Sequence, residues 1–401
     1  MAQLRVDLLT REYPPDVYGG AGVHVEYLAR ELRRLAGVRV HCFGAPRTGD
    51  QNAGEQNVYA YADPPGLTGA NAALRTMGVD LEMAAGCAGT DVVHSHTWYV
   101  NLAGHVAKLL HGVPHVVTTH SLEPLRPWKA EQLGGGYALS SWCERTGIEA
   151  ADAIIAVSGA MKDDLLGAYP AVDPAKVHVV HNGIDTGQYR PDPGTDVLQR
   201  RGIAPDLPTV VYVGRITRQK GVPYLLRAAR LLPPEAQVVL LAGAPDTPEI
   251  AAEVAQLVAE QQRKHLVWIP EMLPKPEVIQ ILTHSTVFVC PSLYEPMGIV
   301  NLEAMACETA VVATATGGIP EVVADGATGL LVPIEQAADG SGTPVDPDRF
   351  VADLAAAVTA LLTEPARAAE MGRAGRRRAV EHFSWAAIAE RTVEVYRSVR
   401  A

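Results

Sequence analysis

Residues 286–306 read TVFVCPSLYEPMGIVNLEAMA, and this stretch carries the clearest fold signal in the chain. A β-branched, apolar run ends at Cys290, a loop rich in Pro, Ser and Tyr follows, and Gly298 opens an apolar helix. An apolar run without alternation is typical of a strand that is buried on both faces, as in a parallel sheet. The stretch therefore predicts a strand–loop–helix unit of an open α/β sheet, which binds ligands at the carboxyl ends of its strands.

The same alternation of short apolar runs with longer amphipathic stretches continues along the chain, as expected for βα units. Strands are expected in the first half at 4–9, 91–94, 115–119, 153–157 and 177–180, with helices at 23–35 and 98–110. A second series of strands, at 209–213, 237–242, 266–269, 286–290, 310–313 and 329–332, follows a turn at 182–185 and a stretch of linker composition. We expect an α/β protein with two Rossmann-like domains, residues 1–185 and 186–384. The final helix, 385–401, can pack on either domain, and packing on the first domain would require the chain to cross back to it.

The composition narrows the class of protein. A net charge of −11 over 401 residues argues against nucleic acid or an anionic membrane as the main partner. The run Arg376-Arg377-Arg378 is the exception, and a solvated helix face explains it. No apolar run approaches the roughly 20 residues of a membrane helix, and no signal-peptide pattern opens the chain. The five scattered cysteines form no CxxC pair, which is typical of reduced thiols. These features predict a cytoplasmic enzyme.

Two cations follow the strand at 209–213. In the stretch VGRITRQKG, residues 213–221, Arg215 and Lys220 lie five residues apart on the loop and the first helical turn. Two cations at the carboxyl end of a strand suit a diphosphate, and arginine can contact two of its oxygens. Taken alone, an ordinary solvated basic loop is the commoner explanation of such a pair.

The opening stretch offers a second group of binding residues. The free N–H groups of Gly298, Ile299 and Val300 would lie at a helix N-terminus, which binds phosphate without a metal. Glu295 would lie on the loop and Glu303 one or two turns into the helix, where a carboxylate can accept the hydroxyl hydrogens of a ribose. A capping acid and a surface acid are the alternative interpretation of these two residues.

Here the residues carry a resemblance to a known family. Glu295 and Glu303, with seven residues between them, resemble the E-x7-E signature of retaining transferases with the GT-B fold. With GRI at 214–216, KG at 220–221, NGID at 182–185 and GGIPE at 317–321, the chain resembles glycosyltransferase family 4 from end to end. The resemblance implies two Rossmann-like domains facing across a cleft and transfer from a nucleotide sugar with retention. It implies a catalytic role for Glu295, Arg215 and Lys220. It implies donor binding by Gly19, Gly20, Arg215, Lys220, Gly298, Ile299, Val300 and Glu303.

Four further stretches resemble one subgroup of this family, the actinobacterial enzymes related to glycogen synthase. They are TREYPP at 10–15, VYGGAGVH at 17–24, HSHTWY at 94–99 and HSLEPLRPWK at 120–129. The α-maltose-1-phosphate synthases of the subgroup transfer glucose from ADP-glucose to glucose 1-phosphate. Bacterial glycogen synthases carry Lys-Thr-Gly-Gly where this chain has VYGG, and His-Asp-Trp-His where it has HTWY. A lysine that would meet the donor diphosphate and an aspartate that would meet the acceptor sugar are both missing.

The missing aspartate bears on the acceptor. Thr97 stands in its place, and the loss of a carboxylate favours an anionic acceptor because like charges repel. Arg11, Arg126 and Lys129 are candidate ligands for an acceptor phosphate, with ordinary surface cations as the alternative. We therefore expect glucose 1-phosphate as the acceptor and α-maltose 1-phosphate as the product, in α-glucan biosynthesis.

Three of the thirteen histidines lie at expected strand ends, one as an expected catalytic residue and two without an assigned role. The resemblance places His120, which follows the strand at 115–119, beside the donor sugar, where it contacts the 6-hydroxyl. His94 and His96 flank Ser95 at another strand end, but no third ligand follows at a spacing that suits zinc. Asp346-Pro347-Asp348 is formally a metal-binding DxD motif, but its Gly/Pro/Asp surroundings predict a turn. We expect no metal and no cofactor besides the donor.

The nearest alternative is a glycogen synthase that elongates an α-1,4-glucan from ADP-glucose or UDP-glucose; sucrose-, mannosyl- and lipid-directed transferases are others. A dehydrogenase is excluded because GGAG at 19–22 does not fit GxGxxG. A non-catalytic sugar-nucleotide-binding protein would have no need of Glu295 and Glu303 together with Arg215 and Lys220. The expected partners are a nucleotide sugar and a sugar phosphate or α-glucan, with no nucleic acid and no membrane. The sequence does not decide which nucleobase the donor carries or whether the protein forms a homodimer.

Overall fold

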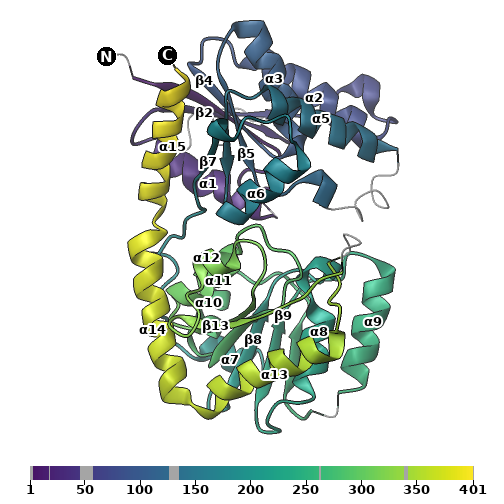
Figure 1. Ribbon diagram of the computed structural model, residues 1–401, viewed down its shortest axis with the longest axis vertical. Coiled ribbons are helices and arrows are strands. Elements are labelled where there is room, and N and C mark those ends of the chain that lie inside the picture. The colour runs from purple at the N-terminus through teal and green to yellow at the C-terminus, as the bar shows by residue number, and fades with distance from the viewer. Residues whose placement is uncertain are drawn as a thin grey trace. The chain divides into compact units, whose positions relative to one another are not determined.

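The computed structural model describes residues 3–17, 19–45, 57–125, 135–261, 263–337 and 342–400. The chain divides into two compact units, each with its own parallel sheet (Figure 1). Unit 1 comprises residues 1–183 and 385–401, and unit 2 comprises residues 184–384. The last segment of the chain therefore belongs to the first unit.

Unit 1 is a seven-stranded sheet in the order β3-β2-β1-β4-β5-β6-β7, in which every paired strand is parallel. Its strands are β1 (Arg5–Thr10), β2 (Gly37–Phe43), β3 (Val58–Tyr61), β4 (Val92–His96), β5 (His115–Thr119), β6 (Ala153–Ala156) and β7 (Val177–Val179). Its α-helices are α1 (Gly20–Leu32), α2 (Ala72–Gly86), α3 (Trp98–His111), α5 (Gly136–Ala150), α6 (Gly159–Ala168) and α15 (Trp385–Val399). Short 3-10 turns occupy η1 (Pro65–Leu67), η2 (Glu123–Leu125) and η3 (Pro174–Lys176).

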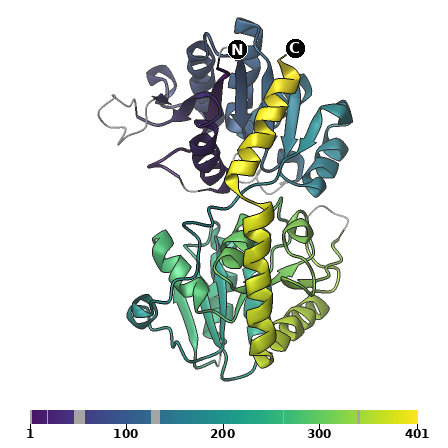
Figure 2. The ribbon, with the colours of Figure 1, turned by 90° about the vertical axis from the view of Figure 1, so that its left-hand side faces the viewer.

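The C-terminal helix α15 completes the core of unit 1. It lies beside α1 over one face of the sheet, as Figures 1 and 2 show. Trp385, Ile388 and Tyr396 of this helix are buried with Val6 and Leu8 of β1 in one apolar cluster. A second cluster lies between the sheet and helices α2 and α3. The burial of apolar surface on both faces explains why α15 belongs to this unit although it is remote in sequence.

Unit 2 is a six-stranded sheet in the order β10-β9-β8-β11-β12-β13, and its paired strands are again parallel. Its strands are β8 (Thr209–Val213), β9 (Gln237–Leu241), β10 (Leu266–Ile269), β11 (Val287–Cys290), β12 (Ala310–Thr314) and β13 (Gly329–Val332). Its helices are α7 (Asp196–Arg200), η4 (Arg218–Lys220), α8 (Val222–Ala229), α9 (Pro248–Ala259), α10 (Lys275–Thr283), α11 (Ile299–Ala306), α12 (Ile319–Val322), α13 (Pro347–Thr363) and α14 (Pro365–His382). An apolar cluster joins the sheet to α8, α9 and α13.

Each sheet has one topological switch point, where the strand order reverses. It lies between β1 and β4 in unit 1 and between β8 and β11 in unit 2. Loops that leave neighbouring strands at such a point diverge to opposite sides of the sheet and open a crevice for ligands. In unit 1 the flanking loops begin after Thr10 and His96, and in unit 2 they begin after Val213 and Cys290.

Two strands, β2 and β3, were not expected from the sequence. β2 reads GVRVHCF, so Arg39 and His41 break the apolar run that marked the other strands. The structure accommodates Arg39 because its guanidinium donates two hydrogen bonds to the Asp7 carboxylate of β1, at 2.7 and 2.6 Å. β3 is a four-residue strand at the edge of the sheet, too short to give a clear pattern.

The solvated-face interpretation of Arg376–Arg378 is wrong for two of the three arginines. The guanidinium of Arg376 donates to the carbonyl oxygens of Ala306, at 2.5 Å, and Tyr189, at 3.2 Å. Arg378 donates to the carbonyl oxygens of Val322 and Glu321. Only Arg377 is exposed. The outer two arginines therefore fasten α14 to its own unit through backbone carbonyls, including those of Ala306 and Val322 at the ends of α11 and α12.

Candidate functional site

The residues expected to bind the donor diphosphate lie at the switch point of unit 2. Arg215 follows β8 and is exposed, and its carbonyl oxygen accepts a 2.7 Å hydrogen bond from the hydroxyl of Tyr212. Because Tyr212 is buried in β8, this bond fixes the backbone that carries the guanidinium. Lys220 ends the short turn η4 on the same loop.

The loops after β8 and β11 are fastened to each other. The Leu293 amide donates to the Gln219 carbonyl at 2.8 Å, and the Gln219 side chain donates to the Tyr294 carbonyl at 2.8 Å. A Cβ atom at Gly221 would lie 2.0 Å from the Pro291 carbonyl oxygen, so only glycine permits this approach. Lys220 of one loop is thereby held next to Glu295 of the other.

Lys220 and Glu295 form an ion pair across these two loops. The ammonium lies 2.5 Å from Oε2 of Glu295, and the same oxygen accepts a 3.2 Å bond from the Ser292 hydroxyl. The lysine side chain is 21% exposed and the glutamate side chain 10%. Burial alone would lower the pKa of Lys220, but the Glu295 carboxylate outweighs burial and holds that pKa above its usual value. The lysine is therefore a fixed positive charge.

Helix α11 supplies backbone donors beside this pair. Gly298 precedes the helix with φ of 85°, and no side chain caps it. The first amides of a helix have no carbonyl partner within it, so those at Gly298, Ile299 and Val300 are available to an anion. The expected group of Arg215, Lys220, Glu295 and this helix end thus comes together at one switch point.

Glu303 lies in the second turn of α11. Burial raises the pKa of its carboxyl group to about 7, although a hydrogen bond with Tyr189 and the charge of Lys275 act in the opposite direction. A carboxylate that is costly to leave without partners gains from hydroxyl donors. A ribose diol would supply two such donors.

In unit 1, the glycine loop expected to meet the donor already holds an anion of the protein. The Gly19 amide donates at 2.7 Å to the carboxylate of Glu12, which thus takes the place of a ligand at the start of α1. A Cβ atom at Gly20 would meet no other atom within 4 Å. Of the two glycines, Gly20 therefore leaves open space and Gly19 does not.

The expected acceptor residues are only partly within the described structure. Arg126 and Lys129 lie outside the described residues. The Arg11 guanidinium stacks over the Tyr99 ring, 4.1 Å from its centre, an arrangement that stabilises a cation. Thr97 precedes α3 with φ of 72° and ψ of 163°, a backbone region that is almost restricted to glycine. A β-branched residue in this conformation stores strain, which is typical of a functional position.

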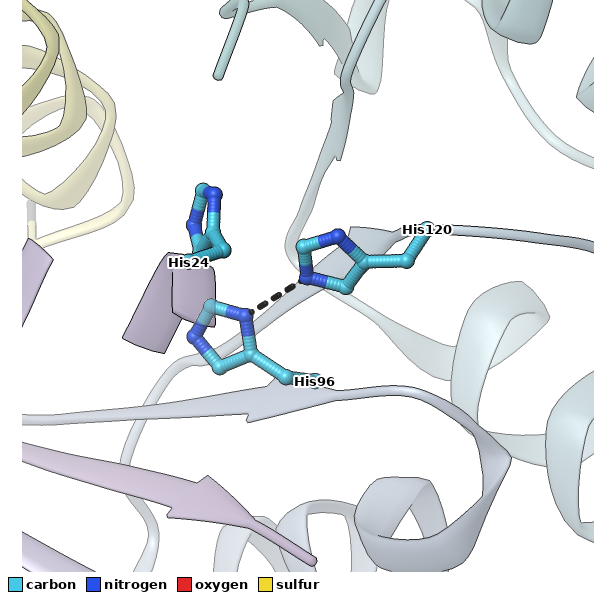
Figure 3. A group of neighbouring side chains, drawn as sticks. All are labelled: His24, His96 and His120. Atoms are coloured by element: carbon cyan, nitrogen blue, oxygen red, sulfur yellow. Dashed lines mark hydrogen bonds between the residues drawn. The ribbon is translucent and has the colours of Figure 1, made fainter. Parts of the chain in front are cut away.

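His120 belongs to a cluster of histidines, drawn in Figure 3. His24 comes from α1, His96 ends β4 and His120 follows β5. Nδ1 of His96 lies 3.1 Å from Nε2 of His120, and Nδ1 of His24 lies 2.6 Å from the side-chain oxygen of Asn182. Burial lowers the pKa of His24 to about 4 and those of His96 and His120 well below 6.5. The three rings are therefore uncharged at neutral pH.

Sequence spacing predicted no third metal ligand beside His94 and His96. The fold, however, brings His24 and His120 next to His96. One nitrogen of each of His24, His96 and His120 lies within 4.8 Å of the other two. His94 takes no part in this group. Its two nitrogens bond to the hydroxyls of Tyr396, at 2.7 Å, and Thr118, at 2.6 Å.

A second group of metal-ligand residue types, Asp7, His41 and Cys87, is also buried in unit 1. Its groups are already engaged with protein partners, since Asp7 pairs with Arg39 and Nδ1 of His41 lies 2.8 Å from the Tyr61 hydroxyl. Burial raises the pKa of the Cys87 thiol far above its usual value, and the thiol donates to the Met83 carbonyl. This group is structural. The formal DxD motif, which was expected to form a turn, lies at the start of α13, where Asp346 caps the helix by accepting from the Arg349 amide at 3.0 Å.

Sequence comparison bears on both units. Residues 18–188 match the model of Glycosyltransferase Family 4, and residues 196–378 match the model of Glycosyl transferases group 1. The chain is 57% identical over 403 residues to the α-maltose-1-phosphate synthase of Mycolicibacterium smegmatis, covering 99% of this chain and 100% of that protein. The chain belongs to glycosyltransferase family 4. It is therefore a glycosyltransferase, as the E-x7-E pattern predicted.

Other members of the family give the range of similarity. The α-maltose-1-phosphate synthase of Mycobacterium tuberculosis is 55% identical, with 99% of this chain and 100% of that protein covered. A glycogen synthase of the same organism is 30% identical, with 98% and 94% covered. The expected relation to these two groups of enzymes is confirmed, and the chain is much more similar to the first.

Solved structures support the fold. Sucrose-phosphate synthase from Thermosynechococcus elongatus superposes with a TM-score of 0.78 at 24% identity, covering 99% of both chains. Anabaena HepE, in complex with UDP-glucose, gives a TM-score of 0.78 at 20% identity and covers 98% of this chain and 100% of that chain. The expected GT-B class, with two Rossmann-like parallel-sheet domains, is confirmed. Within the described residues, no helix has both the length and the apolar character needed to cross a membrane.

Proposed function

We propose that the protein transfers glucose from ADP-glucose to glucose 1-phosphate and forms α-maltose 1-phosphate with retention of configuration. The observation that carries the acceptor and the product is the 57% identity to an α-maltose-1-phosphate synthase over essentially the whole of both chains. The arrangement at the unit 2 switch point supports a nucleotide diphosphate as the activating group of the donor.

In this proposal the donor diphosphate is held by protein groups alone. Arg215, Lys220 and the first amides of α11 stabilise the negative charge that develops as the bond from the anomeric carbon to the diphosphate breaks. Glu303 accepts the ribose hydroxyls. His120, of unit 1, contacts the 6-hydroxyl of the glucosyl group.

The bonding changes of the step balance without a further reactant. The anomeric carbon acquires oxocarbenium character, an acceptor hydroxyl oxygen bonds to it, and the departing diphosphate oxygen takes the hydroxyl proton. Front-side attack retains the configuration. A double displacement would need Glu295 as a nucleophile, but its Oε2 is engaged by Lys220 and Ser292. This ion pair suits a glutamate that positions Lys220 and balances its charge. It does not suit a glutamate that attacks the anomeric carbon.

A glycogen synthase is the second candidate, because a glycogen synthase of Mycobacterium tuberculosis is 30% identical along nearly the whole chain. The two candidates differ in the acceptor and share the donor chemistry. The buried free cysteines and the donor together favour the cytoplasm as the place of action.

The proposal is tested by offering ADP-glucose or UDP-glucose with glucose 1-phosphate or glycogen, and by identifying products with mass spectrometry and proton NMR. The expected product is a hexose disaccharide phosphate with two α-anomeric signals, formed fastest from ADP-glucose. A β-linked product would refute retention. Turnover should also persist in EDTA, since protein groups carry the charge; abolition by EDTA with rescue by Mg²⁺ would refute that part.

A further inference from the structure

We propose that His24, His96 and His120 form a binding site for a transition-metal ion of the zinc class, and that its occupation inhibits transfer. The site lies wholly within unit 1 and is built from three segments that the sheet brings together (Figure 3). The inhibitory part rests on the proposed function, because it requires His120 to act on the donor sugar.

The hydrogen bond between His24 and Asn182 prepares the His24 ring as a metal ligand. Its Nδ1 lies 2.6 Å from Oδ1 of Asn182, and an amide oxygen only accepts, so Nδ1 carries the hydrogen. Nε2 therefore presents a lone pair. This atom is buried and has no hydrogen-bond partner among the described residues, in a side chain that is 3% exposed. Metal-bound histidines usually donate their other N–H to an oxygen in this way.

The other two rings offer a bridging position. Nδ1 of His96 and Nε2 of His120 are 3.1 Å apart and share one proton. Tetrahedral Zn²⁺ with Zn–N bonds of roughly 2.0–2.1 Å places its ligand nitrogens about 3.3 Å apart. A metal ion can replace the shared proton with little opening of this pair, while His24 moves inward from a separation of at most 4.8 Å. The ring that held the proton then carries it on its other nitrogen, so no net proton is released.

The chemistry of the ligand set indicates which metals fit. Three imidazoles without a carboxylate suit Zn²⁺, Cu²⁺ or Ni²⁺, whereas Mg²⁺ and Ca²⁺ prefer oxygen ligands. His24 and His96 are buried but His120 is partly exposed, so solvent reaches the site from the side of His120. Three protein ligands leave a fourth position for water or a phosphate oxygen. Bound metal would hold His120 by its Nε2 and remove it from the sugar.

The chain contains matched controls. His94 lies against His96 with ring centres 4.2 Å apart and the rings tilted by 39°, but both its nitrogens are engaged, so it cannot serve as a ligand. Cys87 belongs to the other buried group and tests whether metal binds there instead. His382 is an exposed histidine and tests weak surface binding.

The first experiment measures binding and needs no substrate. Metal-free protein is titrated with Zn²⁺ against a chromophoric chelator, and with Co²⁺ while the visible spectrum is recorded. We expect one site, and a Co²⁺ spectrum of a tetrahedral site without thiolate charge-transfer bands. His24→Gln and His96→Gln should each abolish metal binding. Asn182→Ala should weaken the metal affinity by about 10–100-fold. Cys87→Ala and His382→Ala should leave the metal affinity unchanged.

Three results would overturn the site: no stoichiometric binding by the wild type, binding that survives both His24→Gln and His96→Gln, or thiolate bands in the Co²⁺ spectrum. The wild-type spectrum decides the ligands even if a histidine variant fails to fold. Inhibition is then measured as the loss of donor turnover on adding Zn²⁺, and its recovery with EDTA. Binding without inhibition would refute the place of His120 at the sugar, and with it that part of the proposed function, while leaving the metal site intact.

Discussion

Arg215 and Lys220 both serve the donor diphosphate in our account, yet the structure predicts that their loss has different consequences. Arg215 is exposed, and the bond from Tyr212 to its carbonyl oxygen does not depend on its side chain. Arg215→Ala should therefore change the free energy of unfolding by no more than about 0.5 kcal/mol. Turnover should fall by about 100–1,000-fold, which corresponds to about 2.7–4 kcal/mol of lost transition-state stabilisation.

Lys220→Ala should damage both stability and turnover. Removal of the ammonium leaves the Glu295 carboxylate, 10% exposed, with the Ser292 hydroxyl in place of its ion pair. Loss of one partner of a fully buried pair costs about 3–5 kcal/mol, and the partial exposure here reduces that to about 1–3 kcal/mol. Adding Glu295→Gln to Lys220→Ala removes the unpaired charge, so the double variant should regain stability but not activity.

Urea unfolding and nucleotide-release kinetics on the four variants, including Glu295→Gln alone, measure both quantities. The expected pattern is an activity defect without a stability defect for Arg215→Ala, and both defects for Lys220→Ala. Turnover of Arg215→Ala within about threefold of wild type would refute the assignment of the diphosphate to this loop. Equal stability of Lys220→Ala and wild type would refute the ion pair.

Three further predictions test other parts of the site. The pKa of Glu303 is raised from 4.5 to about 7, so its stabilising contribution is complete below about pH 4.5 and is lost as pH rises through 7. Donor binding, which needs the carboxylate, should tighten over the same rise; a pH-independent donor Kd in wild type, equal to that of Glu303→Gln, would contradict the ribose contact. Thr97→Gly should relieve about 1–3 kcal/mol of backbone strain against about 0.5–1 kcal/mol of glycine entropy. The Thr97→Gly variant should therefore unfold at a higher urea concentration than Thr97→Ala, which retains the strain. Equal unfolding midpoints for the two variants would contradict backbone strain at position 97. Arg126→Ala or Lys129→Ala should raise KM for glucose 1-phosphate and spare KM for the donor, and an equal rise in both would remove these cations from the acceptor.

Most of the fold could be predicted because its central strands are buried on both faces. Apolar runs such as TVVYV at 209–213 and VFVC at 287–290 predict central parallel strands from the sequence alone. β2 could not be predicted in this way, since Arg39 looks like a surface residue until Asp7 of the neighbouring strand is known. The return of α15 to unit 1 was left open for a similar reason. Its apolar face is visible in the sequence, but the surface that covers it is not.

The same limit applies to the candidate site. Arg215, Lys220 and Glu295 could be named from local pattern and family resemblance. Their pairing could not, because residues 75 positions apart meet only when β8 and β11 become neighbours. The cluster of His24, His96 and His120 depends on the order β1-β4-β5, which no spacing in the sequence encodes. Glu12 lies in the TREYPP motif, but its bond to Gly19 at the start of α1 could not be predicted from the sequence.

We propose a sugar phosphate as the acceptor. The most direct measurement offers the enzyme ADP-glucose with glucose 1-phosphate, glucose or glycogen under identical conditions, and compares kcat/KM for the three acceptors. A phosphate that makes charged hydrogen bonds worth about 1.5–3 kcal/mol each should favour glucose 1-phosphate over glucose by at least about tenfold. Glycogen should be the poorer acceptor as well. Efficient elongation of glycogen, with glucose 1-phosphate no better than glucose, would contradict the account and identify the enzyme as a glucan synthase.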